Sequence, residues 1–203
     1  MVRNILPEGI ECLFVRQPAP LGLGHAVLCA KRAVGNDPFA VLLADDFIVS
    51  EEKGVTSDLV SALEKTRKIQ HSNMDIFGSE ISNYGVVQFN SINGNVEGLV
   101  EKPEENLAPS NSASIGRYVL TAEIFDILEN QTVGKGGEIQ LADAINLLAK
   151  ENKVETVKLK GNRFDCGSVK GYLAGITVDK KSKFQLPVKL GSIREPAWSP
   201  FLN

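Results

Sequence analysis

The sequence predicts a single domain with a mixed α/β fold. The apolar run at 39–43 (FAVLL) is typical of a strand that is buried on both faces of a parallel sheet. Strand-like and helix-like segments alternate from about residue 11 to residue 70, as they do in sheets with right-handed crossover helices. Two further strand-like segments, 85–89 and 96–100, flank an Asn-Gly-Asn turn sequence, which predicts a β-hairpin added to the sheet.

The expected elements follow one another without an internal repeat, a linker or a low-complexity segment. Strands are expected at 11–16, 39–43, 85–89, 96–100, 113–120 and 154–159. Helices are expected at 24–33, 55–70, 121–130 and 138–150, with a last one that starts near Ser168. We therefore expect residues 1–203 to form one domain, long enough to bury a core without disulfides or structural metals.

Composition and charge exclude several classes of protein. The chain is 43% apolar and 23% charged, as ordinary globular proteins are. A net charge of −3 argues against a nucleic-acid or anionic-membrane partner, and no apolar run approaches the ~18 residues of a membrane span or forms a leader peptide. The widely spaced Cys12, Cys29 and Cys166 form no disulfide or zinc pattern, which favours reduced cysteines and a cytoplasmic location.

A glycine-punctuated segment, 17–24, lies between an expected strand and an expected helix. Because glycine has no β-carbon, a loop that contains Gly22 can approach a flat base closely. The Gln17 amide offers both a donor and an acceptor, which can match the edge of a pyrimidine. The alternative is an ordinary turn, since the segment is neither a G-x-G-x-x-G motif nor a P-loop with its lysine.

Acidic residues follow two of the expected strands. Asp45 and Asp46 end the apolar run, and open α/β sheets bind ligands at the carboxyl ends of their strands. Strand side chains alternate in direction, so one of this pair faces a site. Mg²⁺ takes one or two carboxylates besides phosphate oxygens, so one aspartate here and Asp165 would suffice. The alternatives are a solvated strand end, and a helix cap that Asp165 forms with Ser168.

Glu101 and Lys102 end the second hairpin strand, where Pro103 stops the ladder. A carboxylate can accept hydrogen bonds from two neighbouring sugar hydroxyls, and a lysine ammonium suits a phosphate. A bulge or a strand end would let both side chains reach one ligand. The alternative for this pair is a surface ion pair. Glu138, which follows two glycines, is more commonly part of a helix cap.

Seven segments resemble, in their order and spacing, those of the bacterial UTP–glucose-1-phosphate uridylyltransferases of the sugar-nucleotidyltransferase superfamily. The segments are VRQ…PLGLGHAVLCA, PFAVLLADD, YGVV, VEKP, APSN…GRYVL, GGEIQLADAI and RFDCGS. The resemblance covers about residues 1–175, whereas the tail at 176–203 diverges from the family. No single segment is specific, but seven in the same order are.

The resemblance implies a Rossmann-like fold with a mixed, mostly parallel sheet flanked by helices. It also implies a Mg²⁺-dependent enzyme, commonly self-associating, that converts UTP and glucose 1-phosphate to UDP-glucose and pyrophosphate. On this resemblance, Gln17 and Gly22 would contact the uracil, and Asp45 and Asp165 would bind the metal. Gly85, Glu101 and Lys102 would contact the glucosyl phosphate, and Asn111 and Glu138 would contact the sugar. Asp45, Lys102 and Asp165 would be the catalytic residues.

The chain departs from the family pattern at its start. Family members begin with a glycine-rich G-x-G-T-R loop and a lysine segment that wrap the triphosphate, and the 203 residues contain neither. The resemblance thus leads us to expect a chain truncated at its N-terminus. An active uridylyltransferase is one hypothesis, and a catalytically incompetent homologue that at most binds UDP-sugar, or a gene fragment, is the alternative. Ser112 and Ser114 also replace apolar residues of a buried strand.

Overall fold

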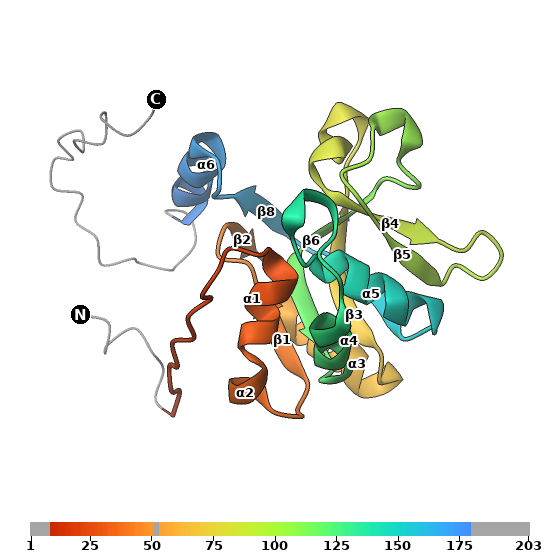
Figure 1. Cartoon of the computed structure of the whole chain (residues 1–203). Helices are drawn as coiled ribbons and strands as arrows, with labels where there is room; N and C mark the ends of the chain where they lie inside the picture. Colours follow the sequence, from red (N-terminus) through yellow and green to blue (C-terminus); the bar gives the residue numbers. More distant parts are fainter. Residues whose placement is uncertain (1–8, 51–52, 180–203) are drawn as a thin grey trace, which may run out of the picture.

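The computed structural model describes residues 9–50 and 53–179, which form a mixed sheet with helices on both faces (Figure 1). The strands are β1 (Phe39–Leu42), β2 (Asp46–Val49), β3 (Ile69–Asp75), β4 (Gly85–Phe89), β5 (Val96–Glu101), β6 (Ser112–Leu120), β7 (Val154–Lys158) and β8 (Asn162–Asp165). The α-helices are α1 (Leu23–Cys29), α2 (Lys31–Val34), α3 (Val55–Thr66), α4 (Glu123–Asn130), α5 (Leu141–Lys150) and α6 (Val169–Asp179). Short 3-10 helices are Gly78–Asn83, Glu105–Leu107 and Lys135–Gly137.

Strand β6 organises the main sheet. The strand order is β5-β4-β6-β3-β7, and β1 pairs with the last four residues of β6. β6 runs antiparallel to β1, β3 and β4, and β4 and β5 form an antiparallel hairpin. The mixed α/β class and the added hairpin are confirmed. Parallel pairing is rarer than expected, because β6 opposes each of its neighbours and β3–β7 is the one parallel pair among the described strands.

The two faces of the sheet carry separate apolar cores. Successive residues of a strand point to opposite faces, so Val119 packs against α3 while Leu120 joins the core on the other side. Leu59 and Leu63 of α3 complete the first core. The larger core lies under α1, α4 and α5, where Phe125 is buried, and the β4–β5 hairpin extends alongside α5 (Figure 1). Helices on both faces thus fix the strands whose ends carry the loops.

Strands β2 and β8 form a separate antiparallel ribbon that joins distant parts of the chain. Asp46 lies opposite Asp165 in the ribbon register, and Phe47 lies opposite Phe164. The two phenylalanine rings are 6.1 Å apart between centroids. The ribbon therefore places the two acidic segments of the sequence next to each other, just before α6 begins.

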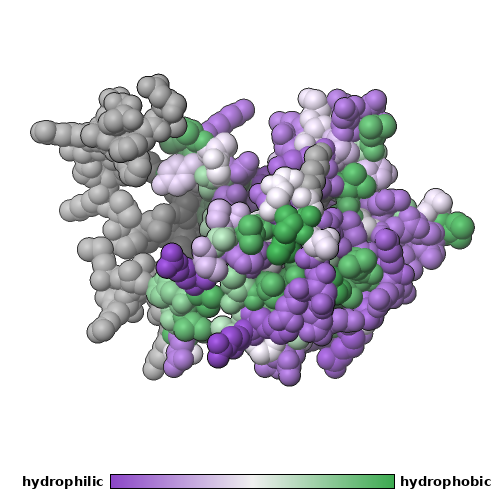
Figure 2. All heavy atoms as spheres, in the orientation of Figure 1, coloured by the Kyte–Doolittle hydropathy of each residue, from purple (hydrophilic) through white to green (hydrophobic). Residues whose placement is uncertain are grey.

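The expected strand at 11–16 is wrong. The described residues before α1 form neither helix nor strand, and Leu13 and Phe14 are 72% and 87% exposed. An apolar run becomes a strand only with a pairing partner, and no described strand pairs with this one. Figure 2 shows hydrophobic residues gathered over this segment and α1.

Strand β1 is less buried than the apolar run predicted. Its residues alternate between half-buried and exposed, and Leu42 is 55% exposed. Phe39 and Val41 pack on the larger core, where the Phe39 ring stacks on Phe125 at 4.9 Å. Burial on both faces is therefore wrong for β1 among the described residues, because only the face toward α4 is covered.

Strand β3 takes the place of the last part of the helix expected at 55–70. Helix α3 ends at Thr66, Arg67 caps it with a left-handed backbone (φ of 60°), and Ile69 opens β3. The next four residues, 70–73 (Gln-His-Ser-Asn), are polar and yet buried. They lack the apolar alternation that indicates a strand, so β3 could not be predicted from the sequence pattern.

The remaining elements lie close to their expected positions. The helix expected at 24–33 divides into α1 and α2, and the one expected at 138–150 begins at Leu141. Residues 180–203, most of the divergent tail, lie outside the described residues. In the described part of the chain, the helices lack the combination of length and apolar character that a membrane crossing requires.

Candidate functional site

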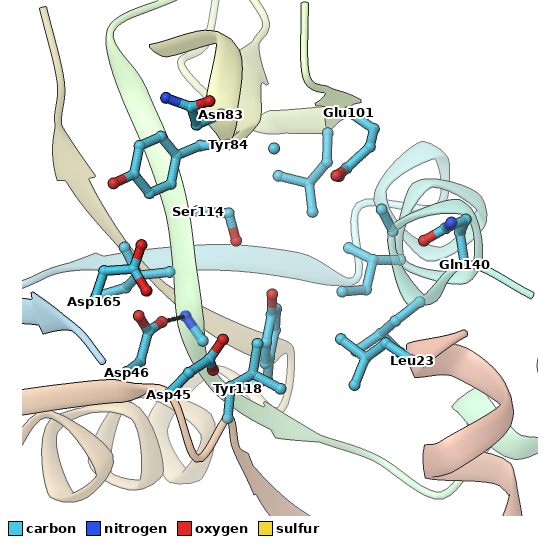
Figure 3. Close-up of a pocket in the computed structure, with 18 of the residues that line it drawn as sticks. Leu23, Asp45, Asp46, Asn83, Tyr84, Glu101, Ser114, Tyr118, Gln140 and Asp165 are labelled. Atoms are coloured by element: carbon cyan, nitrogen blue, oxygen red, sulfur yellow. Dashed lines mark hydrogen bonds between the residues drawn. The ribbon is translucent and has the colours of Figure 1, made fainter. Parts of the chain in front are cut away.

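A cavity of about 520 Å³ lies over the middle of β6, between the β2–β8 ribbon and the first turns of α1 and α5. Figure 3 shows its walls, which come from segments far apart in the sequence. On the side of the β2–β8 ribbon lie Asp45, Asp46 and Asp165, and on the side of the β4–β5 hairpin lie Tyr84, Gly85 and Glu101. The side opposite the ribbon carries Leu23 and Gln140, and the floor carries Ser114 and Tyr118. The arrangement brings acidic groups and hydroxyls around one space that can hold a drug-sized ligand.

Asp45 and Asp165 lie together at the end of the ribbon. The backbone N–H of Cys166 donates to the carbonyl of Asp45 at 2.7 Å, which ties the two chain segments together. A β-carbon on Gly167 would lie 3.1 Å from Asp165 Oδ1 and 3.5 Å from Asp45 Oδ2, so both carboxylates face the same point. The described residues contain no cluster of three or more potential metal ligands. Two carboxylates nevertheless fit Mg²⁺, which takes its other ligands from phosphates and water.

Asp165 also takes part, with Ser168, in the cap before α6, as the alternative interpretation of this residue predicted. Its Oδ1 accepts a hydrogen bond from Gly167 N at 3.0 Å, and its carbonyl accepts one from the Ser168 hydroxyl at 3.0 Å. The Ser168 hydroxyl in turn accepts a hydrogen bond from Gly171 N at 3.1 Å. The cap fixes the Asp165 carboxylate in direction, so capping and ligand binding are compatible roles for this residue.

Asp46 points into the protein and is 4% exposed. Its Oδ2 accepts a hydrogen bond from Gly116 N at 2.6 Å, and its Oδ1 accepts the Arg163 guanidinium in a buried ion pair. Burial lowers the pKa of Arg163, but its hydrogen bond and charge interaction with Asp46 outweigh burial and raise that pKa. The Arg163 guanidinium therefore stays positively charged. Of the two adjacent aspartates, Asp45 is the exposed one.

Arg163 is a cavity-lining residue that the sequence interpretation missed, as it missed Tyr84, Ser114, Tyr118 and Gln140. Arg117 lies outside the cavity lining, but it supports the turn that carries Asp45. Arg163 Nη1 donates to the Tyr84 hydroxyl at 2.9 Å, and the guanidinium lies 5.1 Å from the centre of the Tyr84 ring. Arg117 donates to the carbonyls of Leu43 at 3.1 Å and of Asp46, which braces the turn between β1 and β2. Both arginines stand inside segments quoted for the resemblance, but no spacing rule predicts an arginine paired across a ribbon.

Gly85 and Glu101 lie opposite each other in the β4–β5 hairpin and both line the cavity. A β-carbon on Gly85 would lie 3.1 Å from Glu101 Oε2. Lys102 is exposed, has a φ of 44° and is not among the lining residues, although its N–H donates to the Tyr84 carbonyl at 3.0 Å. Asn111 is likewise exposed and outside the cavity lining. The hairpin thus brings two of these four predicted residues to the cavity.

The predicted base-binding segment lies beside the opposite wall. Gln17 Nε2 donates to the Gly22 carbonyl at 3.1 Å and lies 3.0 Å from His25 Nδ1. Gly22 has a φ of 90°, and a β-carbon there would lie 2.9 Å from Glu138 Cβ, so only glycine fits. Glu138 accepts a hydrogen bond from Gln140 Nε2 at 2.6 Å. Gln140 lines the cavity, whereas the other four residues of this group do not.

The floor of the cavity is polar because of hydrogen bonds between β3 and β6. Ser114 Oγ lies 3.3 Å from Nδ1 of His71, which is fully buried. Burial lowers the pKa of His71 to about 4 and raises the pKa of Tyr118, so both groups are neutral near pH 7. Asn73 Nδ2 donates to Ser112 Oγ farther along the same strands. The two serines that depart from the family pattern are thus paired with the polar residues of β3.

A family profile described as nucleotidyl transferase matches residues 2–182. The chain belongs to the nucleotidyl transferase family. It is similar to the UTP–glucose-1-phosphate uridylyltransferase of Pseudomonas aeruginosa, with 44% identity over 85% of this chain and 63% of that protein. It is also similar to a solved UDP-glucose pyrophosphorylase complexed with UDP-glucose, at 38% identity and a TM-score of 0.76, over 82% of this chain and 65% of that one. A UTP-bound UGPase from Acinetobacter baumannii gives 37% identity and a TM-score of 0.77, over 90% and 65% of the two chains.

These comparisons confirm the resemblance of this nucleotidyl transferase chain to the uridylyltransferases. The chain spans 63% and 56% of the length of the first two curated relatives that it matches.

Proposed function

We propose that this nucleotidyl transferase chain takes part in making UDP-glucose and pyrophosphate from UTP and glucose 1-phosphate, with Mg²⁺. The observation that carries the proposal is the presence of Asp45, Asp165 and Glu101 on the walls of one cavity. A volume of about 520 Å³ lies within the range of small-molecule sites. The similarity to a protein solved with UDP-glucose and to one solved with UTP supports the same ligands here.

Asp45 and Asp165 would hold the Mg²⁺ ion together with phosphate oxygens and water. When bound, the ion neutralises charge on the phosphates during transfer. The point that both carboxylates face beside Gly167 supports a shared ion. Asp46 is paired with Arg163, so two acidic charges of the ribbon wall are available to a divalent cation, which they would balance.

Gly85 and Glu101 would contact the glucosyl phosphate. The Glu101 carboxylate would accept hydrogen bonds from two neighbouring hydroxyls. Without a side chain at Gly85, the sugar ring has room beside Glu101 Oε2. Lys102 would turn its exposed side chain to the phosphate, and we assign Asn111 and Glu138 to the periphery of the sugar site.

Gln17 and Gly22 would contact the uracil. The amide nitrogen of Gln17 is engaged by the Gly22 carbonyl, so its amide oxygen is the group that would accept a hydrogen bond from the base. The backbone of Gly22 would contact the base, and the absence of a side chain there lets the loop pack closely on Glu138.

The sugar phosphate would attack the α-phosphorus of UTP in line, as the bond to pyrophosphate breaks. No covalent enzyme intermediate is required, so the residues of the chain would act by holding both substrates in position. We place the activity in the cytoplasm, which suits the unpaired Cys12, Cys29 and Cys166. We also propose a homo-oligomer, as the resemblance implies.

Pyrophosphate release tests the proposal. The 203-residue chain is incubated with UTP, glucose 1-phosphate and Mg²⁺, with Asp45→Asn as the matched control. We expect pyrophosphate release by the wild-type chain that requires both substrates and Mg²⁺. The Asp45→Asn variant should release none. A well-folded preparation that releases no pyrophosphate would contradict turnover by this chain.

A second candidate function is binding of UDP-glucose without turnover. Arg163 is the one basic side chain among the described residues that line the cavity, and it is engaged by Asp46. Phosphoryl transfer relies on positive charge around the triphosphate, and loss of even one such donor costs about 10²–10³ in rate. Calorimetry with UDP-glucose distinguishes the two candidate functions. A binding heat without pyrophosphate release in the assay supports binding alone. The absence of a binding heat contradicts both candidates and favours the hypothesis of a gene fragment.

A further inference from the structure

Arg163 contacts two walls of the cavity at once. On the ribbon wall its Nε and Nη2 atoms bind Asp46, and on the hairpin wall its Nη1 donates to the Tyr84 hydroxyl at 2.9 Å. The guanidinium also stacks on the Tyr84 ring, 5.1 Å from its centre. The Arg163 side chain is only 12% exposed, which makes it a poor direct ligand for a substrate.

We propose that Arg163 is a positioning residue that fixes the distance between the metal-binding wall and the sugar-binding wall. The inference rests on the proposed function, because it assigns Asp45 and Asp165 to the metal and Gly85 and Glu101 to the sugar.

On the ribbon wall, the Arg163–Asp46 pair determines the positions of both metal-binding carboxylates. Asp46 follows Asp45 directly in the chain and lies opposite Asp165 in the ribbon register. Arg163 stands two residues before Asp165 on β8, so their side chains leave the strand on the same side. A displacement of the ion pair would therefore move both carboxylates.

On the hairpin wall, Tyr84 determines the positions of the two sugar-binding residues. It directly precedes Gly85, and its carbonyl accepts a hydrogen bond from Lys102 N at 3.0 Å. Gly85 in turn lies opposite Glu101 in the hairpin. Tyr84 thus ties together the start of β4 and the end of β5 at the place where both reach the cavity.

The ribbon and the hairpin belong to different sheets, since β2 and β8 pair only with each other among the described strands. The turn before β2 is hydrogen-bonded to β6, which pairs with β4. Arg163 adds a direct side-chain link between the ribbon and the hairpin. A planar guanidinium can donate to Asp46 and to Tyr84 at the same time, because its five N–H groups point in fixed directions. A lysine ammonium has the same charge without this geometry, which makes Arg163→Lys an informative variant.

The test compares UDP and UDP-glucose as ligands of the full 203-residue chain. Tyr84→Phe removes only the hydroxyl that Arg163 binds, and Arg163→Lys keeps a positive charge beside Asp46. We expect each variant to lower the preference for UDP-glucose over UDP about tenfold, the value of one hydrogen bond to a charged group. The affinity for UDP should fall less than the affinity for UDP-glucose, because UDP has no sugar that must reach the hairpin wall. The double variant should lose no more than either single one, because both disrupt the same link.

A preference that is unchanged in both single variants, or losses that multiply in the double variant, would overturn the inference. Urea unfolding of the same four proteins gives a second readout that needs no ligand. Coupling between the two substitutions is expected there, and additive effects would overturn the link between the walls. If the wild-type chain bound neither ligand, the proposed function would be wrong, and the unfolding cycle alone would decide whether Arg163 joins the walls.

Discussion

Asp45 and Asp165 turn one carboxylate oxygen each to the same point, beside the α-carbon of Gly167. The Asp45 oxygen is Oδ2 and the Asp165 oxygen is Oδ1, at 3.5 and 3.1 Å from the position that a Gly167 β-carbon would occupy. Two carboxylates that face one point repel each other unless a cation or a hydrogen-bond donor lies between them. Gly167 N donates to Asp165 Oδ1 at 3.0 Å, and we propose that a divalent cation beside this point balances the two carboxylates.

Gly167→Ala should weaken Mg²⁺-dependent binding of UDP-glucose. The new methyl group would lie 3.1 Å from Asp165 Oδ1, a tight contact that would displace this carboxylate, whereas Asp45 Oδ2 at 3.5 Å would be in ordinary van der Waals contact. We expect a loss of about tenfold or more in affinity in the presence of Mg²⁺, as for changes that misorient metal ligands. Calorimetry measures it, and Gly54→Ala is the control, because a β-carbon there meets nothing within 4 Å. Equal affinities in the two variants would contradict the prediction.

Gly24→Ala should destabilise the fold. A β-carbon on Gly24 would lie 2.6 Å from the Ile139 carbonyl oxygen and 2.9 Å from Leu128 Cδ2. Overpacking of this kind costs roughly 1–3 kcal/mol in the free energy of unfolding. Urea denaturation of the wild-type chain and of Gly24→Ala measures the difference in unfolding free energy. An unchanged denaturation midpoint would show that α1 does not pack this closely on the segment before α5.

Acid should destabilise the protein through His71. Burial lowers the pKa of His71 to about 4, from an ordinary value of 6.5. Between these pH values the unfolded chain binds a proton that the folded chain does not, so stability falls as the pH falls from 6.5 toward 4 and the effect levels off below. The shift corresponds to roughly 3 kcal/mol. His71→Gln should lose correspondingly less unfolding free energy over this range in urea titrations, and identical losses would contradict the assignment.

Gln17→Ala should relax the choice of base. The Gln17 amide nitrogen is engaged by the Gly22 carbonyl, so truncation removes both the support of the loop and the proposed uracil acceptor. Competition binding with UDP-glucose and ADP-glucose measures the selectivity. We expect the preference for UDP-glucose to fall about tenfold, the order of one hydrogen bond and its unpaired partner. An unchanged preference would count against a role for Gln17 in base selection.

The sequence predicted the parts of the fold and site that depend on local patterns. The Asn-Gly-Asn hairpin and β6 lie where expected, and Asp45, Asp165, Gly85 and Glu101 line one cavity. The resemblance supplied their roles, because the local pattern alone left a solvated strand end and a helix cap open.

The features that sequence interpretation missed depend on tertiary contacts. Strand β3 escaped detection because its buried residues 70–73 are polar. Two of them, His71 and Asn73, lie within hydrogen-bonding distance of Ser114 and Ser112 on β6. Arg163 forms an ion pair with Asp46 across the β2–β8 ribbon, and no local sequence pattern predicts that these two segments pair. The apolar segment at 11–16 looked like a strand, but it has no pairing partner among the described residues.

The most direct test of a shared metal at Asp45 and Asp165 is the affinity for UDP-glucose with Mg²⁺ and with EDTA, in the wild-type chain and in Asp45→Asn. We predict that EDTA weakens wild-type binding by about tenfold or more, as expected for the loss of a charged contact. Asp45→Asn should remain folded and bind equally weakly under both conditions, because Asp45 is exposed at a strand end. A variant that still responds to EDTA, or one that unfolds, would contradict the account.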